Sequence, residues 1–274
     1  MRKITPDLTT ELFNHFGNPR FERLGGKPAY RVNTFRQLVE LVAGLSFKNK
    51  DHLLFYRGQI NDYKNKAKVS SFYPTIYRED YLSRKELSER FQRLKATGVM
   101  LASLAEARKI EGYKEIKRRQ NIQWSILQHY EVCPTPYLDF THSLRVACSF
   151  ATLNNTTKQA YIFIFGLPYL TNRISINSEH DIINIRLLSI CPPTAFRPYF
   201  QEGYLVGTDG ISDDYDVKAE LDFNNRLIAK FEIPNDDSFW GQDFNGIPEN
   251  LLYPENDPML DLCMDVKRLI AHKQ

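Results

Sequence analysis

The sequence predicts an α+β fold in which a mixed, mostly antiparallel sheet, concentrated in the second half of the chain, is flanked by helices. Helical apolar spacing dominates the first 150 residues, whereas short strand-like apolar runs, separated by turn-forming residues, dominate the rest. The 274 residues show no internal repeat, and Pro and Gly are scattered rather than gathered into a linker. We therefore expect a single domain over residues 1–274.

The first half supplies most of the predicted helices. Apolar residues recur at helical spacing over residues 35–45, and the apolar run that follows predicts a strand over 52–59. Ser83 with Glu86 three residues later is typical of a capping box and begins a long helix. Because glycine weakens helices, we predict that this helix is broken or bent near Gly98.

A second set of elements begins with a helix over residues 121–130. Pro134 and Pro136 end that helix and favour extended backbone, so a short strand is predicted over 137–140. Ser143 is the expected N-cap of the next helix. Further apolar runs predict four strands, over residues 160–165, 182–190, 204–206 and 227–233. A closing helix is predicted over residues 258–272.

Composition excludes several classes of protein. Hydrophobic residues make up 42% and charged residues 25%, as in ordinary folded domains, so intrinsic disorder is not expected. No apolar run approaches the ~20 residues of a spanning helix and no signal peptide is visible, so we expect a cytoplasmic protein without a membrane partner. The four cysteines form no Cys-x-x-Cys pair, and neither disulfides nor a metal site is expected.

Tyr56, Arg57, Gly58 and Gln59 form the first candidate for a binding site. A guanidinium that follows an apolar strand offers a rigid fork for a phosphate or carboxylate, and Gly58 would let a ligand approach the backbone. The alternative is a structural arginine paired with a carboxylate.

The second candidate runs from His129 to Ser143 and is dense in hydroxyl, imidazole and carboxylate groups. Thr141 and Ser143 are suited to hold a sugar hydroxyl while His129 or Tyr130 stacks or hydrogen-bonds, but Asp139 and Ser143 are equally suited to cap the following helix. A hydrolase triad of serine, histidine and aspartate lacks the Gly-x-Ser-x-Gly turn that projects such a serine. The spacing of His129, Cys133, Asp139 and His142 matches no zinc pattern.

The third candidate is the segment from Arg197 to Tyr204, in which Gln201 and Glu202 stand just before a glycine and an apolar strand. A carboxylate at this place can stabilise a cationic transition state or activate a nucleophile. The alternative is a solvated acidic residue in a turn.

Taken in order, the three segments resemble the FRG domain, a family named for its Phe-or-Tyr, Arg, Gly motif. The matching residues are Tyr56-Arg57-Gly58-Gln59, Gln128-His129-Tyr130, Leu138-Asp139-Phe140-Thr141 and Gln201-Glu202-Gly203-Tyr204. The resemblance spans about residues 53–206, preceded by a helical lead-in, and residues 246–254 look like the closing segment of the family. The chain departs from the family in two places: the turn after the His-Tyr pair is one residue longer, and a glutamine is common where Glu202 stands.

A more distant resemblance is to ADP-ribosyltransferases, whose core has an early Arg, a Ser/Thr motif leading into a helix, and a late Glu or Gln. It implies NAD as co-substrate and a macromolecular acceptor. Arg57 would bind the phosphate or ribose, Thr141 and Ser143 would frame the nicotinamide ribose, and Glu202 would stabilise the oxocarbenium as nicotinamide leaves. The family resemblance further implies a bacterial or phage-related setting, with a role in phage defence or as a toxin.

Two other functions remain open on the sequence. The first is a non-catalytic module in which Arg57 and the segment from His129 to Ser143 recognise a nucleotide, a phosphate or a partner protein. The second is a nuclease that uses His129 with Arg57. The small net charge of +3 gives nucleic-acid binding little support.

Overall fold

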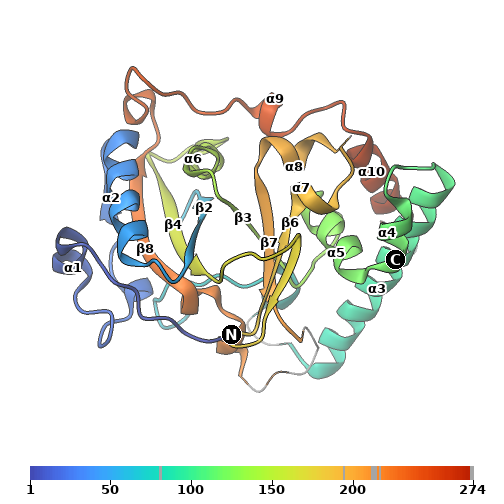
Figure 1. The fold of residues 1–274 in the computed structure, drawn as a ribbon, viewed down its shortest axis with the longest axis horizontal. Coiled ribbons are helices and arrows are strands. Elements are labelled where there is room, and N and C mark those ends of the chain that lie inside the picture. The colour runs from blue at the N-terminus through green and yellow to red at the C-terminus, as the bar shows by residue number, and fades with distance from the viewer. Residues whose placement is uncertain (80–81, 194, 211–214, 216, 272–274) are drawn as a thin grey trace. The chain divides into compact units, whose positions relative to one another are not determined.

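The computed structural model describes residues 1–79, 82–193, 195–210, 215 and 217–271, and it confirms the α+β class (Figure 1). Where the sequence predicts one domain, the contacts within the chain group its residues into two compact units. Unit 1 comprises Met1–Phe72, Phe140–Tyr169 and Ala219–Glu249, and unit 2 comprises Tyr73–Asp139, Leu170–Lys218 and Asn250–Gln274.

Unit 1 is built on a mixed sheet whose strands follow the order β1-β8-β4-β2. β1 pairs with β8 in parallel, whereas β8, β4 and β2 pair antiparallel, and Thr141 of β3 pairs with Tyr56 of β2. Helix α6 packs against β2 and β4. The elements are α1 (Thr10–Phe16), η1 (Leu24–Gly26), β1 (Tyr30–Arg31), α2 (Phe35–Lys48), β2 (Leu53–Gln59), the end of β3 (Leu138–Thr141), α6 (Leu144–Thr152), β4 (Gln159–Leu167), η4 (Phe223–Arg226), β8 (Leu227–Pro234) and η5 (Asp237–Phe239).

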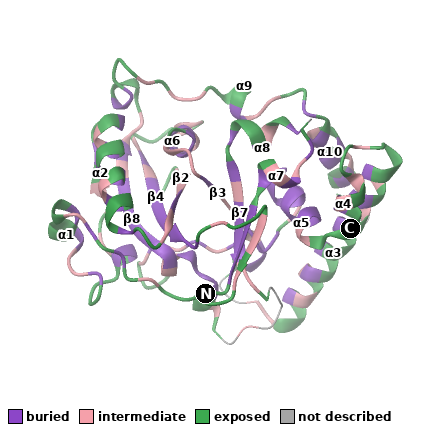
Figure 2. Cartoon of the chain, viewed as in Figure 1, coloured by how far each residue is buried: buried purple, intermediate pink, exposed green. Residues whose placement is uncertain are grey.

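Aromatic side chains fill the core on one face of this sheet. Phe163 and Phe165 of β4 lie 4.7 and 5.0 Å, between ring centroids, from Phe72. Phe140 lies 5.0 Å from Phe165 and 5.5 Å from Phe223. All five are buried, as are most residues of β4 and β8 in Figure 2. These five phenylalanines therefore pack the core of unit 1.

Unit 2 combines three antiparallel strands, in the order β5-β6-β7, with a group of helices. Helix α3 packs against α4, α5 and α10. The elements are η2 (Thr75–Tyr77), α3 (Arg84–Ala107), α4 (Tyr113–Arg118), α5 (Gln120–His129), β5 (Ile174–Asn177), β6 (Ile182–Arg186), α7 (Leu187–Ile190), α8 (Phe196–Phe200), β7 (Gly203–Thr208) and α10 (Pro258–Ala271), while η3 (Lys218–Leu221) and α9 (Glu249–Leu252) each begin or end in unit 1.

The structure contradicts a break at Gly98 and the second part of one predicted strand. Helix α3 runs without a break through Gly98, because the glycine admits Gln123 of α5: a Cβ at residue 98 would lie 2.6 Å from the Gln123 side-chain oxygen. The predicted strand over 182–190 ends at Arg186, and the last four residues form helix α7. The closing helix begins at Pro258 as predicted, while its predicted end, His272, lies outside the described residues.

The capping prediction at Ser83 was confirmed, because Ser83 and Glu86 form the capping box that begins α3. Thr34 caps α2 by accepting the Gln37 N–H at 3.2 Å. Among the described residues, none of the helices combines the length and the apolar character that crossing a membrane would require.

Candidate functional site

The Tyr-Arg-Gly-Gln motif lies on β2 in unit 1, where its alternate residues point to opposite faces of the sheet. Arg57 stands opposite Phe163 of β4, and Gln59 stands opposite Tyr161, so both motif side chains share one face. Both are half-buried. Burial also raises the pKa of the Tyr56 hydroxyl above its ordinary value.

Gly58 points to the other face, and there it is helix α6 that comes close to the backbone. A Cβ at residue 58 would lie 1.9 Å from the carbonyl oxygen of Ala147 and 3.0 Å from the Cβ of Ala151. The sequence suggested that this glycine admits a ligand. The structure instead fills that space with the backbone of α6, so the glycine is required for packing between strand and helix.

Thr141 and Ser143 form the junction between β3 and α6. The Thr141 hydroxyl oxygen accepts the Ser143 N–H at 3.0 Å, and the Ser143 hydroxyl oxygen accepts the Val146 N–H at 3.4 Å. This confirms Ser143 as the N-cap of α6. Because each hydroxyl accepts one hydrogen bond here, its own hydrogen stays available for a further acceptor.

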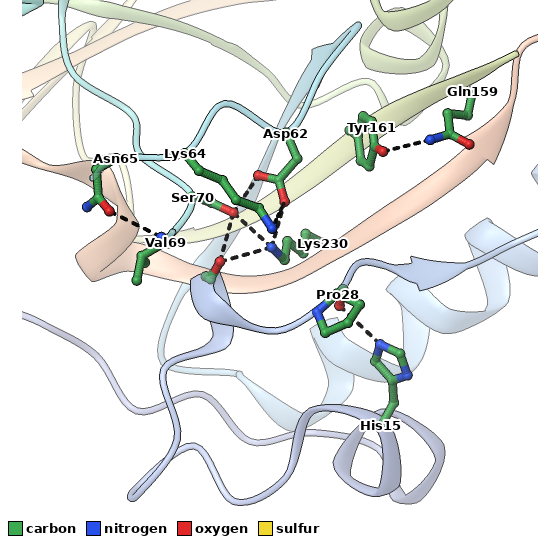
Figure 3. Close-up of polar contacts among 11 residues, drawn as sticks. His15, Pro28, Asp62, Lys64, Asn65, Val69, Ser70, Gln159, Tyr161 and Lys230 are labelled. Atoms are coloured by element: carbon green, nitrogen blue, oxygen red, sulfur yellow. Dashed lines mark hydrogen bonds and ion pairs between the residues drawn. The ribbon is translucent and has the colours of Figure 1, made fainter. Parts of the chain in front are cut away.

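A buried lysine anchors the segment that follows the motif (Figure 3). Lys230 of β8 is fully buried, and its ammonium donates to the Asp62 carboxylate at 2.7 Å, the Ser70 hydroxyl at 2.8 Å and the Gly25 carbonyl at 3.0 Å. Desolvation lowers the pKa of this ammonium, although Asp62 acts in the opposite direction. The sequence contains a signal for this anchor, a lone lysine within the apolar run 227–233, which the sequence reading did not use.

In unit 2, His129 belongs to a polar network centred on Asp139. The imidazole Nδ1 lies 3.4 Å from one carboxylate oxygen, and the Gln128 amide donates to the other at 2.7 Å. The Thr135 hydroxyl in turn donates to Gln128. The His129 side chain is only 2% exposed whereas that of Asp139 is 41% exposed. Of the two, the carboxylate is therefore the group that solvent reaches.

Tyr130, predicted to stack on a ligand, is a buried core residue. Its hydroxyl donates to Asp257 at 2.7 Å, and burial together with this carboxylate strongly raises the pKa of the phenol. In the described part of the chain, no three His, Cys, Asp or Glu side chains are arranged to hold a metal ion.

The turn formed by Gln201, Glu202 and Gly203 connects α8 to β7. Gln201 is buried and its side-chain amide donates to the carbonyl of Leu252 at 2.7 Å. Glu202 is exposed and has a φ of 45°, in the left-handed region that non-glycine residues rarely adopt. Gly203, the residue after Glu202, lies close to His129, because a Cβ at residue 203 would lie 3.3 Å from Cε1 of the imidazole.

Unit 2 thus brings together two motif segments that are about 70 residues apart in the sequence. The His129 ring lies against Gly203, and the exposed Glu202 carboxylate stands between two anchored residues. Within unit 1, the Arg57 strand is joined to the Thr141 strand through the pairing of Tyr56 with Thr141. Of the predicted site residues, unit 1 therefore contains Arg57 and Thr141, and unit 2 contains His129 and Glu202.

Residues 52–160, which contain the first two candidate segments but not Gln201 or Glu202, match the family model of the FRG domain. The molecule is an α+β protein, and its chain contains an FRG domain whose matched residues are drawn from both units. No curated protein matches the chain, and neither does any solved structure.

Proposed function

We propose that the protein is an ADP-ribosyltransferase-like enzyme that uses NAD and that Glu202 is its central catalytic residue. The observation that carries this proposal is the place of the exposed Glu202 in the chain: it lies between the buried Gln201 and Gly203, and Gly203 packs against the His129 ring of a second motif segment. This neighbourhood, and not the left-handed backbone that Glu202 shares with other residues, distinguishes Glu202. A role in phage defence or as a toxin would be the biological setting of this activity.

The proposed reaction breaks the bond between C1′ of the nicotinamide ribose and the ring nitrogen of nicotinamide. Nicotinamide leaves with the bonding electron pair, and positive charge develops on the ribose as an oxocarbenium. The Glu202 carboxylate stabilises that charge. A nucleophilic oxygen or nitrogen of the acceptor then bonds to C1′ and loses its proton to solvent.

Unit 1, taken by itself, carries three side chains of the types that bind NAD: Arg57, Thr141 and Ser143. The guanidinium of Arg57 is a planar fork that can bind phosphates. The hydroxyls of Thr141 and Ser143 accept backbone N–H groups and can still donate to ribose oxygens. His129 acts indirectly in this proposal, because its ring is buried against Gly203.

The test is transfer of label from NAD to proteins of a bacterial lysate. We expect wild-type protein to label an acceptor, and Glu202→Gln to reduce labelling by about 100-fold or more, the range found when charge stabilisation is removed from other active sites. Arg57→Ala should weaken NAD binding as well as labelling, because a phosphate contact acts in the ground state too.

A matched control is available in the same unit. Glu131 is also exposed and also has a left-handed backbone, with a φ of 54°, so Glu131→Gln makes the same chemical change outside the turn. It should label as wild type does. Equal loss in the two glutamine variants, or full activity in Glu202→Gln, would contradict the assigned role.

A non-catalytic binding module is the second candidate, and one observation favours it. Many polar groups of the motif segments are engaged in hydrogen bonds within the protein, including those of Gln128, Thr135, Ser143 and Gln201. Under this alternative a nucleotide would raise the melting temperature without being consumed. Thermal unfolding with NAD, ADP-ribose and ATP, followed by chromatography of the nucleotide, distinguishes the two functions.

A further inference from the structure

Arg197, the first residue of the third candidate segment, contacts several other residues of unit 2. It lies on α8, half-buried, and its Nη1 donates to the backbone carbonyl of His129 at 2.9 Å. The guanidinium also lies over two aromatic rings, 4.5 Å from the centroid of Tyr253 and 5.4 Å from that of Tyr130. A planar cation that hydrogen-bonds and stacks at once is held in one orientation.

The backbone of Arg197 is fixed as well. Its N–H donates to Asp257 at 3.0 Å, and the same carboxylate oxygen accepts the Tyr130 hydroxyl at 2.7 Å. Asp257 is itself only 1% exposed, and its other oxygen accepts the Met259 N–H at the start of α10. The guanidinium of Arg197 is therefore attached to the segment that contains His129 and Tyr130, and its backbone N–H is attached to Asp257, just before α10.

From Arg197 the connection to Glu202 is short. The carbonyl of Arg197 accepts the Gln201 N–H at 3.1 Å, and the carbonyl of Tyr199 accepts the Glu202 N–H at 3.3 Å. These bonds form the last turn of α8, immediately before the left-handed residue. Because left-handed backbone is unfavourable for glutamate, it persists only where its surroundings impose it.

We propose that Arg197 is a positioning residue for Glu202: it fixes α8 against the His129-Tyr130 segment and so holds the turn that presents the carboxylate. Its catalytic consequence rests on the function proposed above. The structural part does not, since it concerns only the order of the turn.

The test compares Arg197→Lys with Arg90→Lys. Lysine keeps the positive charge but loses the planar group that bonds and stacks. Arg90 is the matched control, because it is a half-buried arginine of the same unit whose Nη1 donates to the Ile76 carbonyl at 3.0 Å and which pairs with Glu79, outside the turn. Three quantities are measured: urea unfolding, hydrogen exchange of residues 197–206, and the steady-state kinetics of NAD cleavage.

We expect Arg197→Lys to speed exchange of the Gln201 and Glu202 amides about tenfold, since their protection depends on local order. Its kcat should fall by about tenfold or more while KM for NAD changes less than about twofold, as expected when a reacting group is misplaced. Arg90→Lys should leave both the exchange at the turn and kcat unchanged, whatever it does to global stability.

The outcomes separate this inference from the proposed function. Unchanged exchange at the turn in Arg197→Lys overturns the inference, whether or not the protein cleaves NAD. Faster exchange in a protein whose wild type cleaves no NAD supports the positioning role and rejects the enzymatic function. Faster exchange with an unchanged kcat also rejects the inference, because the turn would then not govern the reaction.

Discussion

Replacing Gly58 by alanine should disrupt the contact between β2 and α6. The added Cβ would lie 1.9 Å from the Ala147 carbonyl oxygen, whereas even a short C···O contact is about 3.3 Å. The contact must open by about 1.4 Å, and the obstacle is helix backbone that cannot rotate away. Overpacking a core typically costs about 1–3 kcal/mol. We expect about 3 kcal/mol or more here, a large part of the 5–15 kcal/mol that stabilises a typical domain.

Urea unfolding followed by circular dichroism measures this cost. Gly26→Ala is the control in the same unit, because the nearest atom to an added Cβ there is 3.9 Å away and φ is not positive. That variant should unfold within about 0.5 kcal/mol of the wild type. If Gly58→Ala were equally mild, the packing role assigned to the motif glycine would be refuted.

Three further predictions concern stability. Lys230→Met should cost about 3 kcal/mol in urea unfolding, because the largely buried Asp62 carboxylate then keeps only the more exposed Lys64 ammonium, 3.8 Å away, as its cation. Adding Asp62→Asn should recover part of the loss, and no recovery would show that Lys230 and Asp62 are not coupled. Ser143→Ala should cost about 1 kcal/mol through loss of the α6 cap, and a neutral result would contradict the capping role. Burial raises the pKa of the Cys148 thiol well above 9.0, so the unfolded chain releases this proton at a lower pH than the folded chain does, and the free energy of unfolding falls as the pH rises above 9. Cys148→Ala should make this fall shallower by about 1.4 kcal/mol per pH unit. Identical slopes in the wild type and the variant would refute the assignment.

Features of the fold that depend on local chemistry could be predicted from the sequence. The caps at Ser83 and Ser143 are examples, because the capping hydrogen bond joins residues three apart. The predicted break at Gly98 did not occur because packing against a residue distant in the sequence decided between alternatives that local preference left close in energy. Gly98 reads as a helix breaker until Gln123 is seen to need its space.

The candidate site shows the same division. Its three motif segments could be found in the sequence, and Ser143 could be interpreted there as a cap. The surroundings of the motifs could not be predicted, because Arg197 and Asp257 contact His129 and Tyr130 across 60 to 130 positions of the chain. Nor could composition reveal that His129 is buried while Glu202 is exposed.

Release of free nicotinamide from NAD, followed by chromatography over several hours with excess protein, tests the role of Glu202 most directly because it needs no acceptor. If Glu202 stabilises the departing ribose cation, wild type and Glu131→Gln release nicotinamide at the same rate and Glu202→Gln releases it at least about 100-fold more slowly. Equal rates for all three proteins, or no release by the wild type, would contradict that role.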